Sequence, residues 1–413
     1  MPDPALWRAR WMGRFREYVG ATERRVAELR LEADGPSLLP ITRSRVTRVA
    51  DAIERQRVAV SERFARLGEP GEQAQLNMAL SVLSSGEPPE TLLKCYEHLF
   101  RDWCWGQAEN DQALSLVASA LAQRESGAAA SLGRLAVYGA GAGRLAVDVH
   151  QRFATDRTFA VDVNPLPLLV AQELLRGGEA ELPEFPVGPH SDDGFVQAQR
   201  LRGPGELRPG FRLVFADAFS PPFAVGSLDT LLTPWFIDAV EPELPHTLAA
   251  LSRVLRPGGY WVNCGPLRFD GRMASRYMLE DVLELAEQAG FERPVPIKAD
   301  VSYFDAPHSG SRRIETVFAF AVRKLKNAPE LGEAAVPHGP SWVRDPSLNI
   351  PLGEELSNLK RATVFHAGVL SMIDGSCSIR DIAATLGQQW RQNPEQLVPT
   401  LQALLDRLAT RAR

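Results

Sequence analysis

The stretch Leu135-Ala-Val-Tyr-Gly-Ala-Gly-Ala-Gly-Arg-Leu-Ala146 decides the fold of this 413-residue chain. Its first four residues predict a buried strand, and the three alternate glycines predict a tight turn that opens a helix. Glycine permits a positive φ and lets a ligand approach the main chain where a Cβ would collide. A Gly-rich turn can also be purely structural, so the motif needs a second signal.

The second signal is an aspartate at the end of the next apolar run, Thr158-Phe-Ala-Val-Asp-Val163. Asp162 follows the glycines by roughly 20 residues, the spacing at which an acidic residue binds ribose hydroxyls. The Gly-x-Gly-x-Gly spacing differs from the Gly-x-Gly-x-x-Gly of dinucleotide sites, and no second phosphate-binding element is evident. These features favour S-adenosylmethionine over a nicotinamide as the cofactor.

Apolar runs alternate with helical stretches between Arg134 and about Lys324. We expect strands at residues 134–140, 158–164, 211–218, 228–233, 260–265, 294–302 and 315–323. The alternation predicts an α/β fold with a doubly wound parallel sheet, to which the last two strands add an antiparallel edge. Such a sheet resembles the seven-stranded, Rossmann-like sheet of class I methyltransferases. The turn Arg256-Pro-Gly-Gly259 should end the helix that precedes the fifth strand.

The chain should divide into four parts. We expect an N-terminal helical region at 1–125, an S-adenosylmethionine-binding domain at 126–325, a linker at 326–346 and a small helical domain at 347–413. In the first part, Trp7, Trp11, Phe15 and Tyr18 recur at helical spacing, which predicts packing against other helices rather than a membrane surface. The Pro/Gly-rich stretch between Gly177 and Gly210 predicts a lid over the site, with a disordered insertion as the alternative.

Composition narrows the possible partners. The formal net charge is −5 and 45% of the residues are hydrophobic, which favours a soluble enzyme over a nucleic-acid-binding protein. No apolar run reaches the roughly 18 to 20 residues that span a bilayer, so we expect no membrane partner. The four cysteines lie far apart, which indicates neither a zinc site nor a disulfide framework and suits the cytoplasm.

Several separated motifs together resemble the carnosine N-methyltransferase-like family. They are Phe100-Arg-Asp-Trp103, the glycine loop at 139–146, Phe236-Ile-Asp-Ala239, Arg256-Pro-Gly-Gly259 and Trp261-Val-Asn-Cys-Gly-Pro-Leu267. The resemblance covers roughly residues 97–324. It implies methyl transfer from S-adenosylmethionine to an imidazole nitrogen of a histidine-containing compound.

The resemblance also implies roles for individual residues. Arg101 would help to hold the methionine carboxylate, Asp162 would bind the ribose, and Asp217 would face the adenine edge. The cofactor-binding set that follows is Arg101, Gly139, Gly141, Gly143, Asp162, Asp217 and Ala218. A surface salt bridge beside a buried tryptophan is the alternative interpretation of the Arg-Asp-Trp motif.

Asp238 is our candidate for the catalytic and substrate-binding residue. It lies just past the fourth expected strand, at the rim where ligands bind in open α/β sheets. A carboxylate that accepts the N–H of one imidazole nitrogen fixes the tautomer and stabilises the cation formed on methylation. An N-cap of the following helix would use the same residue type, so that alternative stays open.

The family pattern departs at two places that bear on the substrate. Relatives usually have histidine where this chain has Asp270, and tyrosines give way to Ser311-Arg-Arg-Ile-Glu315. These differences make carnosine itself a doubtful substrate. They favour a substrate with a positive charge near Asp270, and Arg312 or Arg313 could bind a carboxylate. His98 is the one histidine that we place near the cofactor, although a plain helix-face role is the alternative.

Residues 347–413 resemble the PqqD-like winged-helix modules that hold leader peptides. The resemblance rests on Ile373-Asp-Gly375 followed by the apolar pattern from Ile379 to Leu386, with a third helix from Pro394 to Ala409. This tail could capture a leader peptide, self-associate or simply dock on the enzyme. Two function classes therefore remain: an enzyme and a non-catalytic scaffold. The favoured enzyme methylates an imidazole nitrogen of a small molecule or peptide, and O- or C-methylation of a recruited peptide is the alternative within that class.

Overall fold

The computed structural model describes residues 4–67, 96–123, 131–240, 243–269, 273–329, 366–373, 377–390 and 393–411. The chain divides into two compact units, Met1–Glu333 and Ala334–Arg413. Asp270 and most of the expected linker lie outside the described residues.

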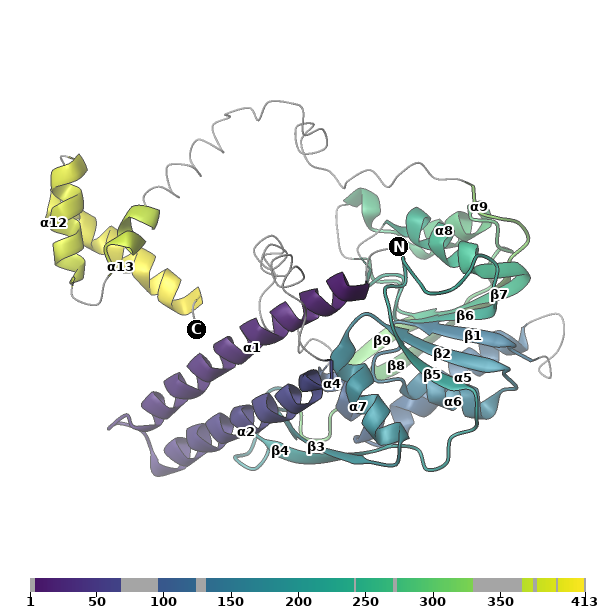
Figure 1. The fold of residues 1–413 in the computed structure, drawn as a ribbon, viewed down its shortest axis with the longest axis horizontal. Helices are drawn as coiled ribbons and strands as arrows, with labels where there is room; N and C mark the ends of the chain where they lie inside the picture. The colour runs from purple at the N-terminus through teal and green to yellow at the C-terminus, as the bar shows by residue number, and fades with distance from the viewer. Residues whose placement is uncertain are drawn as a thin grey trace. The chain divides into compact units, whose positions relative to one another are not determined.

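A seven-stranded sheet forms the centre of the first unit, in the order β5-β2-β1-β6-β7-β9-β8 (Figure 1). The strands are β1 (Arg134–Tyr138), β2 (Arg157–Asp162), β5 (Phe211–Phe215), β6 (Leu228–Pro234), β7 (Leu255–Gly265), β8 (Ile297–Tyr303) and β9 (Arg313–Arg323). The first five pair in parallel, whereas β9 runs antiparallel to both β7 and β8. The predicted fold class is confirmed, and so is the antiparallel edge.

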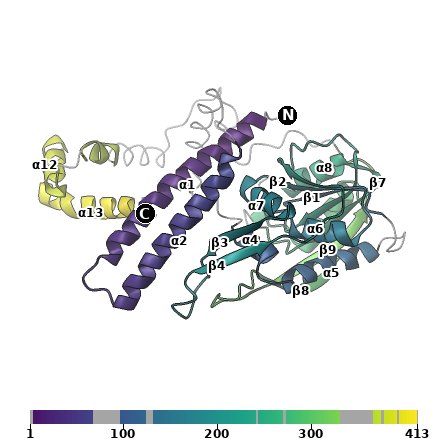
Figure 2. The same ribbon diagram turned by 60° about the horizontal axis from the view of Figure 1, so that its bottom comes forward.

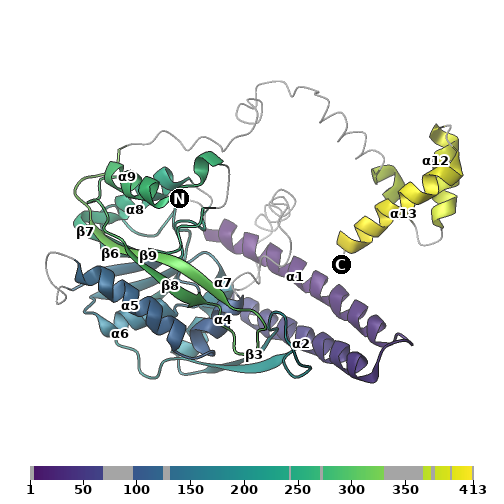
Figure 3. The same cartoon turned by 180° about the vertical axis from the view of Figure 1, so that it is seen from behind.

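Alternate side chains of the central strands pack into two hydrophobic cores, one on each face of the sheet. In β1, Val137 belongs to the first core and Ala136 to the second, as the two-residue period of a strand requires. Helices cover both faces, which Figures 1 and 3 show from opposite sides. They are α4 (Tyr96–Trp103), α5 (Ala108–Ala122), α6 (Arg144–Arg152), α7 (Pro165–Leu175), α8 (Leu244–Val254) and α9 (Leu279–Gln288), with a short 3-10 turn, η2 (Met273–Ser275).

The chain passes from α8 directly into β7 at Leu255, just before the predicted Arg256-Pro-Gly-Gly259 turn, which lies within the first part of β7. A Cβ on Gly259 would lie 2.9 Å from the carbonyl oxygen of Asp229, so the close approach requires glycine. Lys324 is only 2% exposed, and its ammonium donates to the carbonyls of Ser252 and Leu255 at 2.6 and 2.9 Å. This buried lysine satisfies carbonyls that the end of α8 leaves without helical partners.

Two long helices, α1 (Pro4–Ala33) and α2 (Pro40–Ala65), form an antiparallel pair beside the sheet (Figure 2). Trp11 and Tyr18 are buried, and the Phe15 ring stacks on Phe64 with centroids 4.7 Å apart. The predicted packing role is confirmed for Trp11, Phe15 and Tyr18, whereas the side chain of Trp7 lies outside the described part of the chain. No helix among the described residues is long and apolar enough to cross a membrane.

The stretch between Gly177 and Gly210 forms an antiparallel hairpin of β3 (Glu179–Glu184) and β4 (Gln197–Arg202) rather than a disordered insertion. The hairpin packs against α2, and its loop is held there by an ion pair of 2.7 Å between Arg45 and Asp192. A role as a lid stays a prediction.

The second unit is helical where the structure describes it. A helical segment at 366–371 precedes α12 (Ile379–Trp390) and α13 (Pro394–Arg411). Val369, Ile382 and Leu401 form the centre of its small core. The described residues of this unit contain no strand, so the PqqD-like resemblance stays a prediction.

Candidate functional site at the carboxyl edge of the sheet

The glycine loop connects β1 to α6 and contains three left-handed residues. Gly139, Gly141 and Gly143 have φ values of +67°, +56° and +83°. A Cβ at position 139 would lie 2.8 Å from a ring carbon of Phe236, so that position tolerates no side chain. The turn is closed by hydrogen bonds from Ala140 to Val161 and from Gly143 to Ala140. The loop therefore presents bare backbone at the carboxyl edge of the sheet.

The Arg-Asp-Trp motif in α4 packs directly on this loop. Trp103 is buried, and its indole N–H donates to the carbonyl of Ala142 at 3.0 Å. Arg144 begins α6 and donates to the carbonyl of Asp102 at 3.0 Å. Asp102 is 1% exposed, so the motif does not form a surface salt bridge. These contacts give a physical reason for the motif, because it fixes the shape of the glycine loop.

Arg101 lies beside the loop and remains charged although it is largely buried. A small cavity is lined by Arg101, Gly139 and Trp235, among others. Burial opposes the positive charge, but the carboxylate of Asp102 at 2.8 Å and the weaker neighbours Tyr303 and Glu109 raise the pKa of Arg101 overall. The guanidinium is thus a permanent cation next to bare loop backbone.

Asp162 ends β2 and faces the same loop. One carboxylate oxygen accepts the amide of Gly141 and the other accepts the amide of Asn164, both at 2.8 Å. Burial raises the pKa of Asp162 to about 6, although these amides favour the ionised form. Each oxygen of the ionised carboxylate can accept a further hydrogen bond.

Asp217 and Ala218 follow β5 on the next strand of the sheet, and both are half-buried. One oxygen of Asp217 accepts the amide of Phe219 at 3.0 Å, which fixes the turn. The nearby hydroxyl of Tyr138 is buried and has no partner among the described residues. Burial chiefly, and the negative charge of Asp217 next, raises the pKa of this tyrosine.

Asp238 lies past the carboxyl end of β6 and is half-buried. One of its oxygens accepts the amide of Arg268 at 2.7 Å. Burial raises the pKa of Asp238, and the negative charge of Glu315 contributes further. Trp235 donates its indole N–H to Glu315 at 2.8 Å, so Glu315 is close both to this aromatic side chain and to Asp238.

Backbone strain is concentrated at this edge. Trp235, Leu267 and Phe304 have φ values of +43°, +54° and +55°, and they are the non-glycine residues with positive φ in the described part of the chain. They follow β6, β7 and β8, whose carboxyl ends meet at one edge of the sheet. Such strain costs about 1–3 kcal/mol per residue and clusters at functional sites. The strained residues therefore lie at the same edge of the sheet as the glycine loop.

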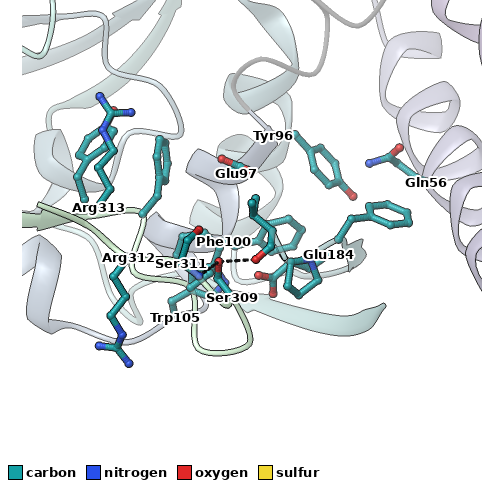
Figure 4. Close-up of a pocket in the computed structure, with 16 residues that line it drawn as sticks. Gln56, Tyr96, Glu97, Phe100, Trp105, Glu184, Ser309, Ser311, Arg312 and Arg313 are labelled. Carbon is teal, nitrogen blue, oxygen red and sulfur yellow. Dashed lines mark hydrogen bonds between the residues drawn. The ribbon is translucent and has the colours of Figure 1, made fainter. Parts of the chain in front are cut away.

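A larger cavity of about 560 Å³ lies beside this edge rather than at the glycine loop. Helices α2 and α4, the end of β3 and the segment after β8 contribute its walls, as Figure 4 shows for the labelled residues. Tyr303 and Phe304 line this cavity, and the guanidinium of Arg101 lies 5.8 and 5.6 Å from their ring centroids. Arg101 also lines the small cavity, so these side chains separate the two spaces.

His98 lies at the same partition. Its Nδ1 is 3.8 Å from the position that a Cβ on Gly141 would occupy, and its ring meets Phe304 edge-on with centroids 4.8 Å apart. Burial and the positive charge of Arg101 hold the pKa of His98 well below its usual range. The imidazole is therefore neutral near pH 7.

Sequence reasoning missed Trp235, Tyr303, Phe304, Glu184 and Glu315, although all of them shape the two cavities or their partition. Trp235 stacks on Tyr303 with centroids 5.6 Å apart, but the two residues come from strands that are distant in sequence. An aromatic residue two positions after a predicted strand was the one signal available for Trp235 and Phe304.

Comparisons with known proteins agree with this geometry. Residues 137–263 match the family model described as "Methyltransferase domain". The search of curated proteins found no match. The fold also resembles solved methyltransferases at low identity. The N-methyltransferase NodS from Bradyrhizobium japonicum WM9 is 13% identical, with a TM-score of 0.35 over 56% of this chain and 99% of that one.

Two further similar structures are N-methyltransferases by their descriptions. The possible histamine N-methyltransferase from Thermotoga maritima is 17% identical, with a TM-score of 0.33 over 57% of this chain and 97% of that one. The phosphoethanolamine N-methyltransferase 2 from Haemonchus contortus is 17% identical, with a TM-score of 0.35 over 51% of this chain and 43% of that one. These likenesses are too distant to transfer a substrate.

The matched segment begins in β1 and ends in β7, so it contains the glycine loop, Asp162, Asp217 and Asp238. The strand order and the position of these residues at the carboxyl edge are those expected for a nucleotide-type cofactor in an open α/β sheet. Residues 137–263 therefore form a class I methyltransferase domain, and the protein is an enzyme that uses S-adenosylmethionine as its cofactor.

Proposed function

We propose that this methyltransferase methylates an imidazole nitrogen of a histidine-derived small molecule or peptide. The observation that carries the proposal is the position of Asp238, past the carboxyl end of β6 at the strained edge of the sheet. Its hydrogen bond from the amide of Arg268 holds the carboxylate in place. A fixed carboxylate at this rim can accept the N–H of a substrate ring.

The residues at the edge fit the cofactor. We assign Gly139, Gly141 and Gly143 to the backbone surface that it follows, and Arg101 to its carboxylate, because the cation and the loop share one cavity. Asp162 offers two oxygens to the ribose hydroxyls. We place the adenine beside Asp217 and Ala218. The buried hydroxyl of Tyr138, which has no hydrogen-bond partner in the described part of the chain, lies nearby.

The reaction requires no activation of the nucleophile by the protein. The bound cofactor supplies an electrophilic methyl group on a sulfonium, and a neutral imidazole is already nucleophilic near pH 7. The enzyme must orient the ring and stabilise the positive charge that develops on it. The Asp238 carboxylate does both when it accepts the second ring N–H. Because burial raises the pKa of Asp238, activity should fall on acidification at a higher pH than for an exposed carboxylate.

Transfer of labelled methyl from S-adenosylmethionine tests the proposal. The acceptors are a panel of histidine-derived compounds and peptides, each paired with an analogue that has phenyl in place of imidazole. We expect label in imidazole compounds alone, and a loss of about 100-fold or more in kcat/KM for Asp238→Asn. Cofactor affinity should hardly change in that variant.

Asp156→Asn is the matched control, because Asp156 is exposed next to the opposite end of β2. That variant should keep full activity. Equal labelling of the phenyl analogues, or an Asp238→Asn enzyme with unchanged kcat/KM on imidazole compounds, would refute the proposal.

A further inference from the structure

The 560 Å³ cavity carries a buried carboxylate that is short of partners. Glu184, at the end of β3, is 3% exposed and lines the cavity. One of its oxygens accepts the side-chain amide of Gln199 at 2.6 Å, and the other has no hydrogen-bond partner among the described residues. A buried ionised carboxylate is costly unless a counter-charge or further donors satisfy it.

A second carboxylate lines the same cavity. Burial raises the pKa of Glu97, and the negative charge of Glu184 raises it further. No cation of the described residues contributes to that shift. Two acidic side chains therefore repel each other across this part of the cavity, and a positive charge between them would relieve the repulsion.

The two arginines that line the cavity already have anionic partners. Arg312 pairs with Asp305 at 3.2 Å, and Arg313 pairs with Glu315. Figure 4 shows both arginines on the side of the cavity opposite Gln56, with the carboxylate residues between these sides. These two arginines therefore do not neutralise the carboxylates of Glu184 and Glu97.

The walls of the cavity suit an organic cation. They include the rings of Tyr96, Phe100, Trp105, Phe185, Tyr303 and Phe304. Aromatic faces attract ammonium groups, and the attraction grows when water is excluded. The indole N–H of Trp105 is buried and has no acceptor among the described residues. A ligand that satisfies these groups therefore carries both a cation and a hydrogen-bond acceptor.

We propose that this cavity binds the end of the methyl acceptor remote from the methylated nitrogen, and that this end carries a primary ammonium group. Glu184 and Glu97 compensate its charge, and the aromatic rings enclose its alkyl chain. Arg313 lines this cavity and pairs with Glu315, whose charge also acts on Asp238, so the cavity and Asp238 adjoin through Glu315. The assignment of the ligand to the methyl acceptor rests on the proposed function, whereas recognition of the ammonium group does not.

The test uses probes that contain no imidazole, so that it does not depend on methyl transfer. The probes are 1-aminohexane and its neutral analogue 1-hexanol, and binding to the full-length protein is followed by ligand-observed saturation-transfer NMR. We expect the amine to bind at least about tenfold more tightly than the alcohol, as a charge-assisted hydrogen bond predicts. Glu184→Gln should abolish that difference and leave binding of the alcohol unchanged.

Glu181→Gln is the matched control, because Glu181 lies on the same strand but is exposed. This variant should retain the preference for the amine. Glu97→Gln provides a second measurement that does not alter the buried hydrogen bond at Glu184, and it should weaken amine binding in part. Equal binding of amine and alcohol by the wild type, or a preference that survives Glu184→Gln, would overturn the proposal. Failure of imidazole methylation would instead refute the proposed function alone.

Discussion

Cofactor affinity should depend on pH through Asp162. Burial raises the pKa of this carboxyl to about 6, so it takes up a proton in a range where an exposed aspartate stays ionised. The ionised form can accept hydrogen bonds from both ribose hydroxyls, whereas protonation removes acceptor capacity. Binding of S-adenosylhomocysteine should therefore strengthen as the pH rises from 5 to 7.

The magnitude follows from the pKa. With a pKa of about 6, the carboxyl is roughly 9% ionised at pH 5 and about 91% ionised at pH 7. If the ionised form alone binds, affinity rises about tenfold over this range, which corresponds to about 1.4 kcal/mol. His98 contributes little to this slope, because its pKa is held well below its usual range.

Isothermal titration calorimetry at pH 5, 6 and 7 measures the slope in the wild type and in Asp162→Asn. The variant should bind more weakly at pH 7, and its affinity should vary by less than about twofold. The asparagine can accept only one of the two amides that Asp162 accepts, so a loss of about 1 kcal/mol in stability is expected. Thermal unfolding checks that the variant is folded. A flat wild-type profile, or an equal slope in the variant, would refute the role of Asp162.

Two substitutions test how the structure supports the site. Gly139→Ala places a Cβ 2.8 Å from the Phe236 ring at a φ of +67°, so we expect a loss of about 2–4 kcal/mol and much weaker cofactor binding. Gly177→Ala has a similar φ but open space around it, and denaturant titration should show a loss of only about 1 kcal/mol with unchanged cofactor affinity. Lys324→Met leaves two buried carbonyls unsatisfied, so urea unfolding should show a loss of about 2–4 kcal/mol, while kcat of the folded enzyme stays unchanged. Equal stability losses in the two glycine variants, or a Lys324→Met protein as stable as the wild type, would contradict these assignments.

The sheet and its order along the chain were predictable from local patterns. Parallel strands buried on both faces give short apolar runs, and glycines and prolines mark where the strands and helices end. The position of Asp162 and Asp238 at the carboxyl edge followed from the same reasoning, because parallel strands end at one edge. Their hydrogen-bond partners did not follow, since Arg268 and Gly141 come from other segments.

By itself, the sequence determined the fold class, the cofactor loop and the side of the sheet on which the site lies, because these depend on contacts between residues close together along the chain. Tertiary structure alone decided that the Arg-Asp-Trp motif packs on the glycine loop, and that Arg101 lies beside Tyr303 and Phe304. It also decided that Glu97 and Glu184 share one cavity. These contacts join residues that are 39 positions apart in the case of Trp103 and Ala142, and 87 apart in the case of Tyr96 and Pro183. No periodic pattern in the sequence predicts these contacts, because they form only when the helices, the hairpin and the sheet pack together.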